Sequence, residues 1–224
     1  MMSSLPISTE VYERWDSICE AFSSPDPLPH FVVIPNFLNP AFLAKMKSGC
    51  QNARLETFCG RIGNEDADIE NSFSEPEENQ VYVTIHQRPR DPLPELDEIN
   101  DSFSSPQMVE LMSKLYGARL NAQGHCGVLT SWGPHSFIEP HTDQGTPEAP
   151  SRLAIALSLT EQWRPEYGGA TYFEWGDQSQ MVRVQPRFNN AVLFETFSGS
   201  YHWVEQISGD APPRTRFTWT FSYL

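Results

Sequence analysis

Two histidines and one aspartate in the second half of the chain have the residue types and the spacing of a metal site. His141 and Asp143 stand two positions apart, and His202 follows in the apolar-rich run YHWVEQI. Side chains at i and i+2 of an extended strand point to the same face, so His141 and Asp143 can reach one ion while Thr142 points away. Two imidazoles and one carboxylate leave three positions open on Fe(II), which suits a non-haem iron oxygenase that takes a 2-keto acid and O2.

The C-terminal run supplies a cation that can pair with an anionic co-substrate of this metal site. Polar and aromatic residues alternate there, Arg216, Thr218, Thr220 and Ser222 with Phe217, Trp219, Phe221 and Tyr223. The period of two predicts a strand with one polar face, which Arg216 shares with Thr218. A guanidinium inside a sheet is unfavourable unless it is paired, and a carboxylate is its natural bidentate partner. The histidines and aspartate alone fit a structural role equally well; the C-terminal arginine favours iron and a dicarboxylic keto acid.

Several sequence runs between residues 132 and 224 accompany the candidate metal ligands and Arg216. They read, in order, WGPHSFIEPHTD, SRLAIALSLTEQW, EYGGATYFEW, VQPRFNNAVLF and RFTWT. With His202, they resemble the catalytic core of the prolyl 4-hydroxylase-like Fe(II)/2-oxoglutarate-dependent dioxygenases. The resemblance covers less than half of the chain, and the N-terminal part matches only in general organisation.

The resemblance implies a set of site residues. Fe(II) is expected on His141, Asp143 and His202, and 2-oxoglutarate on the side chains of Arg216, Thr218 and Trp132. O2 is the second co-substrate, and ascorbate is a possible supporting reductant. At Trp132 the family commonly has a tyrosine whose hydroxyl touches 2-oxoglutarate, whereas an indole can only donate through its nitrogen.

The position of the basic anchor also departs from the family pattern. The family's basic residue usually lies about ten positions after the distal histidine, whereas Arg216 lies fourteen after His202, beyond the turn-rich insert SGDAPPR. Arg214, twelve after His202 and expected on the same strand face, is the rival. Arg216 is preferred because Arg-x-Thr followed by alternating aromatics matches the family. Arg214 is then expected nearer the mouth, and with His135 it is a candidate substrate residue.

The reaction implied by the resemblance is hydroxylation of an aliphatic C–H on an amino acid, a peptidyl residue such as proline, or a related small molecule. 2-Oxoglutarate is decarboxylated to succinate at the same time. Desaturation or oxidative cyclisation of a small molecule by the same cofactor chemistry is the alternative. Asp143 argues against halogenation, because related halogenases have a small residue there. A non-catalytic metal- or ligand-binding β-helix module and a cupin-like enzyme rank lower, because all three ligands and Arg216 are present.

The expected architecture is one domain over residues 1–224, mainly β with flanking helices. Residues 1–120 are expected to supply helical and strand support, with a helix over 9–22 and others starting at Asn39–Pro40 and Ser105–Pro106. Residues 121–224 read as a catalytic core of short strands, with turns at Gly168–Gly169 and a hairpin-type turn at Asn189–Asn190. The family resemblance makes this core a double-stranded β-helix, or jelly roll.

Composition limits the partners. The net charge is −14, from 29 acidic and 15 basic residues, which argues against nucleic acid. No apolar run is long enough to cross a membrane, and the first residues lack the features of a signal peptide. The four cysteines show no CxxC pair, which indicates free thiols and a cytoplasmic location. The acidic stretch 60–80 reads as a surface loop or, alternatively, as a lid over the site. The sequence leaves the oligomeric state open.

Overall fold

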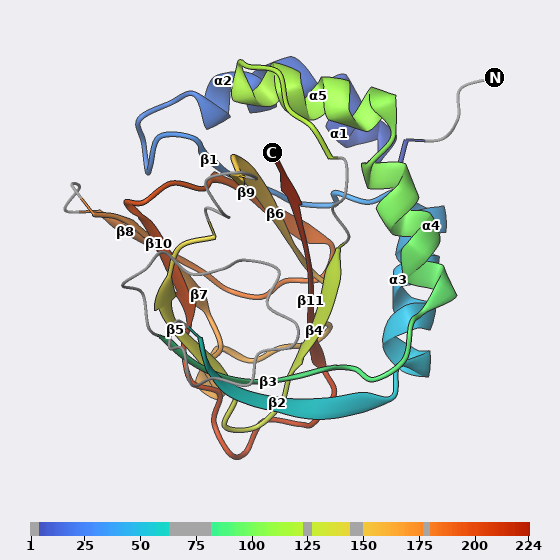
Figure 1. The fold of residues 1–224 in the computed structure, drawn as a ribbon, viewed down its shortest axis with the longest axis vertical. Helices are drawn as coiled ribbons and strands as arrows, with labels where there is room; N and C mark the ends of the chain where they lie inside the picture. Colours follow the sequence, from blue (N-terminus) through green and yellow to red (C-terminus); the bar gives the residue numbers. More distant parts are fainter. Residues whose placement is uncertain (1–4, 63–81, 123–126, 144–149, 177–179) are drawn as a thin grey trace.

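The computed structural model describes residues 5–62, 82–122, 127–143, 150–176 and 180–224 (Figure 1). Over these ranges, eleven strands join into one antiparallel sheet that curls round on itself. Helices cover the outside of part of this sheet. This is the double-stranded β-helix that the family resemblance implies.

The helices are α1 (Thr9–Glu13), α2 (Trp15–Phe22), α3 (Pro40–Asn52), α4 (Pro94–Phe103), α5 (Pro106–Tyr116) and the short 3-10 helix η1 (Pro165–Tyr167). The strands are β1 (Phe31–Ile34), β2 (Leu55–Ile62), β3 (Tyr82–Pro89), β4 (Val128–Trp132), β5 (Phe137–His141), β6 (Leu153–Ser158), β7 (Thr171–Trp175), β8 (Met181–Val184), β9 (Asn190–Glu195), β10 (Ser200–Val204) and β11 (Arg216–Tyr223).

The strand order brings distant parts of the sequence together. It runs β1-β9-β6-β11-β4-β3-β5-β10-β7-β8, with β2 paired to β3. The N-terminal strands β1 and β3 therefore sit inside the same sheet as the C-terminal strands. Figure 1 shows α1, α2 and α5 along one side of the sheet, and α3 and α4 along the neighbouring side.

Large apolar side chains alternate with small or polar ones along β6 and β11. One face of these strands therefore borders the main core, and the other borders the interior of the β-helix. The large apolar residues of the two strands pack in one cluster with the buried residues of the helices, and they include Leu153, Ile155, Leu157 and Trp219. The opposite face of β6 has the small residues Ala154 and Ala156, which pack with Phe173 and Phe194 in a second cluster. This face of β6 therefore borders the interior of the β-helix with small side chains.

Helix ends follow their capping residues. The Asn39 side chain accepts hydrogen bonds from the backbone nitrogens of Ala41 and Phe42, so α3 begins as predicted. The helix expected over residues 9–22 is instead two helices, because the chain leaves helical geometry at Arg14 (φ −100°, ψ 11°). The N-cap of α1 is Ser8, whose hydroxyl accepts from the backbone nitrogen of Val11.

Two further expectations need correction. Residues 60–62 belong to β2 and not to a loop, while 63–81, where a lid was considered, lie outside the described residues. Asn189 has the left-handed backbone of a turn (φ 57°), but the strands on either side of it do not form a hairpin. β9 pairs with β6 and β1, and β8 pairs with β7. The Asn189 side chain instead bonds both backbone groups of Leu38.

The other sequence predictions concern the membrane and the thiols. Within the described ranges, no helix has the length and apolar character needed to cross a membrane. Cys19, Cys50 and Cys59 are free thiols, and Cys126 lies outside the described residues.

Candidate metal centre

The two histidines of the predicted metal site meet across one strand pair. His141 ends β5, and it lies directly opposite His202 of β10 in the antiparallel register. Their ring centres are 4.2 Å apart. Asp143 follows β5 by two residues, and one ligand atom from each of the three side chains lies within 4.8 Å of the others. The Asp143 carboxylate oxygens are 3.2 Å from His202 Nε2 and 3.6 Å from His141 Nε2.

Hydrogen bonding sets the tautomer of His141. Its Nδ1 lies 2.8 Å from the backbone carbonyl oxygen of Glu139. A carbonyl only accepts, so Nδ1 bears the proton and the Nε2 lone pair faces Asp143. This is the arrangement in which a second partner orients a metal-binding imidazole.

Burial and charge favour a neutral imidazole beside a carboxylate. Burial and the neighbouring His202 lower the pKa of His141 to about 4. Burial raises the pKa of Asp143, but the two histidines outweigh that effect and hold the pKa below its ordinary value. An anionic carboxylate next to imidazole lone pairs is the donor set that a divalent transition metal takes.

The aromatic side chains around His202 keep this centre dry on one side. The His202 ring lies 4.9 Å from the Phe194 ring and 6.0 Å from the Phe173 ring, measured between centroids. Phe194 also pairs directly with Ala154 of β6, and Ala154 with Ser222 of β11. Directly opposed residues of an antiparallel pair share a face. The triad therefore faces the same interior as the polar face of β11.

Arg216 is a buried cation on that polar face. Its side chain is 2% exposed, and its Nε and Nη1 have no hydrogen-bond partner among the described residues. Burial lowers the pKa of Arg216 to about 9, but a guanidinium keeps its proton in proteins. A charge held in this way needs an anion, and the bidentate match is a carboxylate.

Other unsatisfied donors lie near the arginine. Trp132 lies opposite Arg216 in the β4–β11 register, and its indole nitrogen is buried without a partner in the described chain. Thr218 lies opposite Ser158 of β6, whose hydroxyl is likewise buried and unpartnered there. Sequence reasoning missed Ser158; the signal was its place on the small-residue face of that strand.

Arg214 lies away from this interior. The strand that was expected to include it begins at Arg216, so the expected shared strand face is wrong. Arg214 instead adopts a left-handed turn conformation (φ 56°), and its Nη2 donates to the backbone carbonyl of Ala53 over 2.6 Å.

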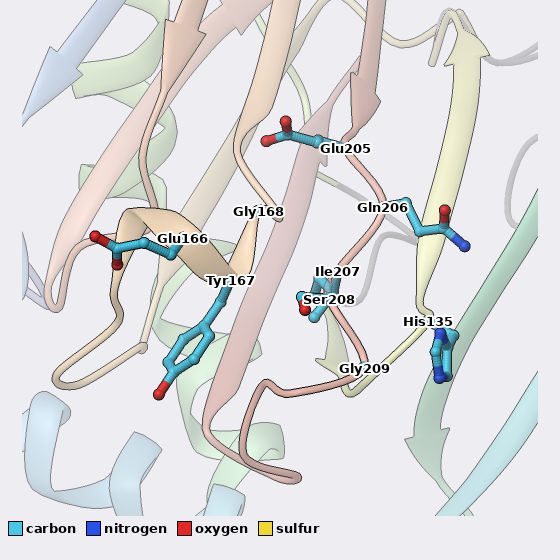
Figure 2. A pocket seen from close by; sticks show the side chains of 9 residues that line it. All are labelled: His135, Glu166, Tyr167, Gly168, Glu205, Gln206, Ile207, Ser208 and Gly209. Atoms are coloured by element: carbon cyan, nitrogen blue, oxygen red, sulfur yellow. The ribbon is translucent and has the colours of Figure 1, made fainter.

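His135 lies in a separate surface hollow (Figure 2). It is exposed, with a left-handed backbone (φ 66°). The hollow has a volume of about 340 Å³ and is lined by His135, Glu166, Tyr167, Gly168, Glu205, Gln206, Ile207, Ser208 and Gly209. None of the three triad residues is among them.

Comparison with known proteins agrees with this geometry. Residues 126–223 match the 2OG-Fe(II) oxygenase superfamily, and this range includes the triad and Arg216. The C-terminal part of the chain, which holds the candidate metal ligands, is therefore similar to that superfamily. No curated protein matches this sequence significantly.

Comparison with solved structures shows that the chain has a prolyl 4-hydroxylase-like fold. A 2OG-Fe(II) oxygenase family oxidoreductase from Burkholderia pseudomallei is similar with a TM-score of 0.62 and 12% identity, covering 93% of this chain and 90% of that one. A Trichoplax adhaerens prolyl hydroxylase, in complex with a hypoxia inducible factor peptide fragment, has a TM-score of 0.62 and 13% identity, with coverages of 97% and 93%. A Pseudomonas putida prolyl-4-hydroxylase has a TM-score of 0.61 and 16% identity, with coverages of 94% and 98%.

Proposed function

We propose that this oxygenase hydroxylates an aliphatic C–H of an amino acid, a peptidyl residue such as proline, or a related small molecule, with decarboxylation of 2-oxoglutarate to succinate. The observation that carries the proposal is the buried, unpaired guanidinium of Arg216 in the interior that the triad also faces, since Nε and Nη1 have no partner among the described residues. A dicarboxylic keto acid supplies the anion that this cation lacks.

His141, Asp143 and His202 would hold Fe(II), which supplies the activation of O2 coupled to oxidation of the keto acid. Asp143 fills the carboxylate position, which favours hydroxylation over halogenation. The neutral His141 imidazole offers Nε2 to the ion while the Glu139 carbonyl holds its Nδ1 proton. Phe173 and Phe194 exclude water from the His202 side.

The co-substrate would be held by donors of three strands. Arg216 pairs with the carboxylate remote from the metal, and the Trp132 N–H and the hydroxyls of Thr218 and Ser158 complete its hydrogen bonds. An indole N–H can replace the tyrosine hydroxyl common in the family, since a carboxylate needs only a donor. Ascorbate would act as a supporting reductant.

The substrate class rests on the similar structures and on the sheet. Two of the similar structures are prolyl hydroxylases, and one of these was solved with a peptide fragment. This supports an amino-acid or peptidyl substrate. We propose a single catalytic domain, because β1 pairs with β9 and β3 pairs with β4 and β5.

The test is the visible absorption of the metal-free protein after anaerobic addition of Fe(II) and then 2-oxoglutarate. A charge-transfer band that needs both additions is expected. His141→Ala should abolish the band, and Arg216→Ala should raise the 2-oxoglutarate concentration needed to form it. Arg214→Ala is the matched control and should behave as wild type. A wild-type protein without the band would overturn the proposal.

A further inference from the structure

His86 of β3 is a buried histidine outside the metal triad. Its side chain is only 3% exposed. Its ring lies between two aromatic rings, with centroids 5.4 Å from Trp132 and 5.1 Å from Phe58. Trp132 in turn lies under the Arg216 guanidinium, 5.1 Å from it. His86 therefore stands directly behind the side chain that faces the proposed co-substrate anchor.

A hydrogen-bond chain fixes the ring of His86. The Thr84 hydroxyl lies 3.2 Å from the Phe137 backbone carbonyl, which can only accept, so the hydroxyl proton points there. The Thr84 oxygen then accepts the Nδ1 proton of His86 over 2.8 Å. The Nε2 lone pair remains, and it accepts from Arg88 Nε over 2.7 Å. Each bond sets the direction of the next, so one tautomer and one ring orientation are selected.

The imidazole is used for support and not as a metal ligand. Both of its nitrogens are engaged by neighbouring side chains. Burial, together with the charge of Arg88, lowers the pKa of His86 to about 3. The ring is therefore neutral near neutral pH and remains an acceptor for Arg88.

Trp132 needs packing contacts to hold its orientation, because no hydrogen bond from its indole nitrogen to a described residue does so. Its indole nitrogen has no partner in the described part of the chain, so only contacts of the ring itself hold it in place. One side packs with the apolar residues Val204, Ile207 and Ala211. The ring of His86 provides a rigid contact, because it is fixed by directed bonds.

We propose that His86 is a positioning residue of the co-substrate pocket: it holds the Trp132 indole in the orientation that serves Arg216 and 2-oxoglutarate. The inference rests on the proposed function. A binding group held in place by a neighbour with a locked rotamer loses less freedom when the ligand arrives. His86 thus acts on affinity through Trp132, without touching the ligand.

The test is a double-mutant cycle on 2-oxoglutarate affinity. Isothermal titration calorimetry of the anaerobic Fe(II)-loaded protein gives the dissociation constant for wild type, His86→Ala, Trp132→Phe and the double variant. We expect His86→Ala to weaken binding about tenfold in the wild-type background and less than about twofold when Trp132 is already phenylalanine. Equal losses in both backgrounds, or no loss in wild type, would overturn the role.

Two further variants separate positioning from general destabilisation. His30→Ala is the matched control, because His30 is also ring-stacked, on Phe22, and hydrogen-bonded, to Glu195. It should lower the unfolding midpoint and leave the dissociation constant unchanged. If His86→Ala does not fold, Thr84→Val removes the hydroxyl that accepts the Nδ1 proton and donates to the Phe137 carbonyl, and it leaves the imidazole in place. It should weaken binding in the same direction, and unchanged affinity would overturn the proposal.

Different results would contradict the proposed function and the proposed role of His86. A wild-type protein that binds no 2-oxoglutarate with Fe(II) contradicts the proposed function itself. A wild-type protein that binds it, with His86→Ala binding equally well, contradicts only the role of His86.

Discussion

The guanidinium carbon of Arg216 lies 5.1 Å from the centre of the Trp132 ring, across the register that joins β11 to β4. Neither Arg216 Nε nor the indole nitrogen has a hydrogen-bond partner among the described residues. A ring face attracts a cation, but it does not accept the directed N–H bonds that a carboxylate does. Among the described residues the pair therefore lacks an acceptor, which the proposed anionic co-substrate would supply.

Replacing the buried charge should separate stability from binding. Arg216→Met removes a buried cation that has no counter-ion among the described residues. The free energy of unfolding of the ligand-free protein should therefore rise by about 1–3 kcal/mol or stay unchanged. The same variant should bind 2-oxoglutarate about 10- to 100-fold more weakly, because its charged hydrogen bonds are lost. Urea unfolding and calorimetry measure the two effects. Arg214→Met is the control, and a fall in 2-oxoglutarate affinity there equal to that of Arg216→Met would contradict the assignment.

Metal binding should stabilise the folded chain through the triad. A ligand that binds only the native state at about 100 times its dissociation constant adds about 2.7 kcal/mol. Anaerobic Fe(II) should therefore raise the thermal midpoint of the wild-type protein, and a chelator should reverse the rise. His141→Ala and His202→Ala should lose the response, while His135→Ala, at an exposed histidine in the separate hollow, should keep it. An undiminished response in both triad variants would contradict the site.

Local patterns were sufficient for the parts of the fold that depend on near neighbours. The alternation from 216 to 223 predicted β11 and its polar face, because a strand repeats every two residues. The Asn39 cap predicted the start of α3. The jelly roll itself came from the family resemblance, and the strand order confirms it.

Long-range contacts account for what sequence reasoning missed. α4 is an exception, because the helical spacing of its apolar Leu96, Ile99 and Phe103 is a local pattern that was not recognised. Asn189 was read as a hairpin turn, although its side chain bonds Leu38 and the flanking strands pair elsewhere. The hydrogen-bond partners of His86 stand two residues away on its own strand. Its ring partners Phe58 and Trp132 come from β2 and β4, so these contacts cannot be seen before the sheet is assembled.

Gly169 should be sensitive to any added side chain. Its backbone is left-handed (φ 69°), and a Cβ there would lie 2.9 Å from Ile207 Cγ1 and 3.3 Å from Arg216 Nε. Gly117 is the matched control, because it is also left-handed (φ 77°) but has no atom within 4 Å of an added Cβ. Gly117→Ala should cost about 1 kcal/mol from backbone strain alone. Gly169→Ala should cost more in urea unfolding and should also weaken 2-oxoglutarate binding; equal costs and unchanged affinity would contradict this packing.

The buried His86 should make stability depend on pH. Its pKa is lowered from 6.5 to about 3 in the folded protein, mainly by burial. Between these values the unfolded chain binds a proton that the folded chain does not, so stability falls as the pH falls. The effect is absent above the unfolded pKa and grows as the pH drops towards 3.

His86→Phe should remove this contribution while keeping a ring in place. Between about pH 7 and about pH 5, the metal-free wild-type protein should lose about 2 kcal/mol more unfolding free energy than the variant. His141, whose pKa is also lowered, to about 4, contributes equally to both proteins and cancels in the difference. Phe58→Leu, which alters the other side of the same stack, should retain the wild-type pH dependence. Urea unfolding at both pH values measures the difference, and parallel losses in wild type and His86→Phe would show that the histidine is not held neutral.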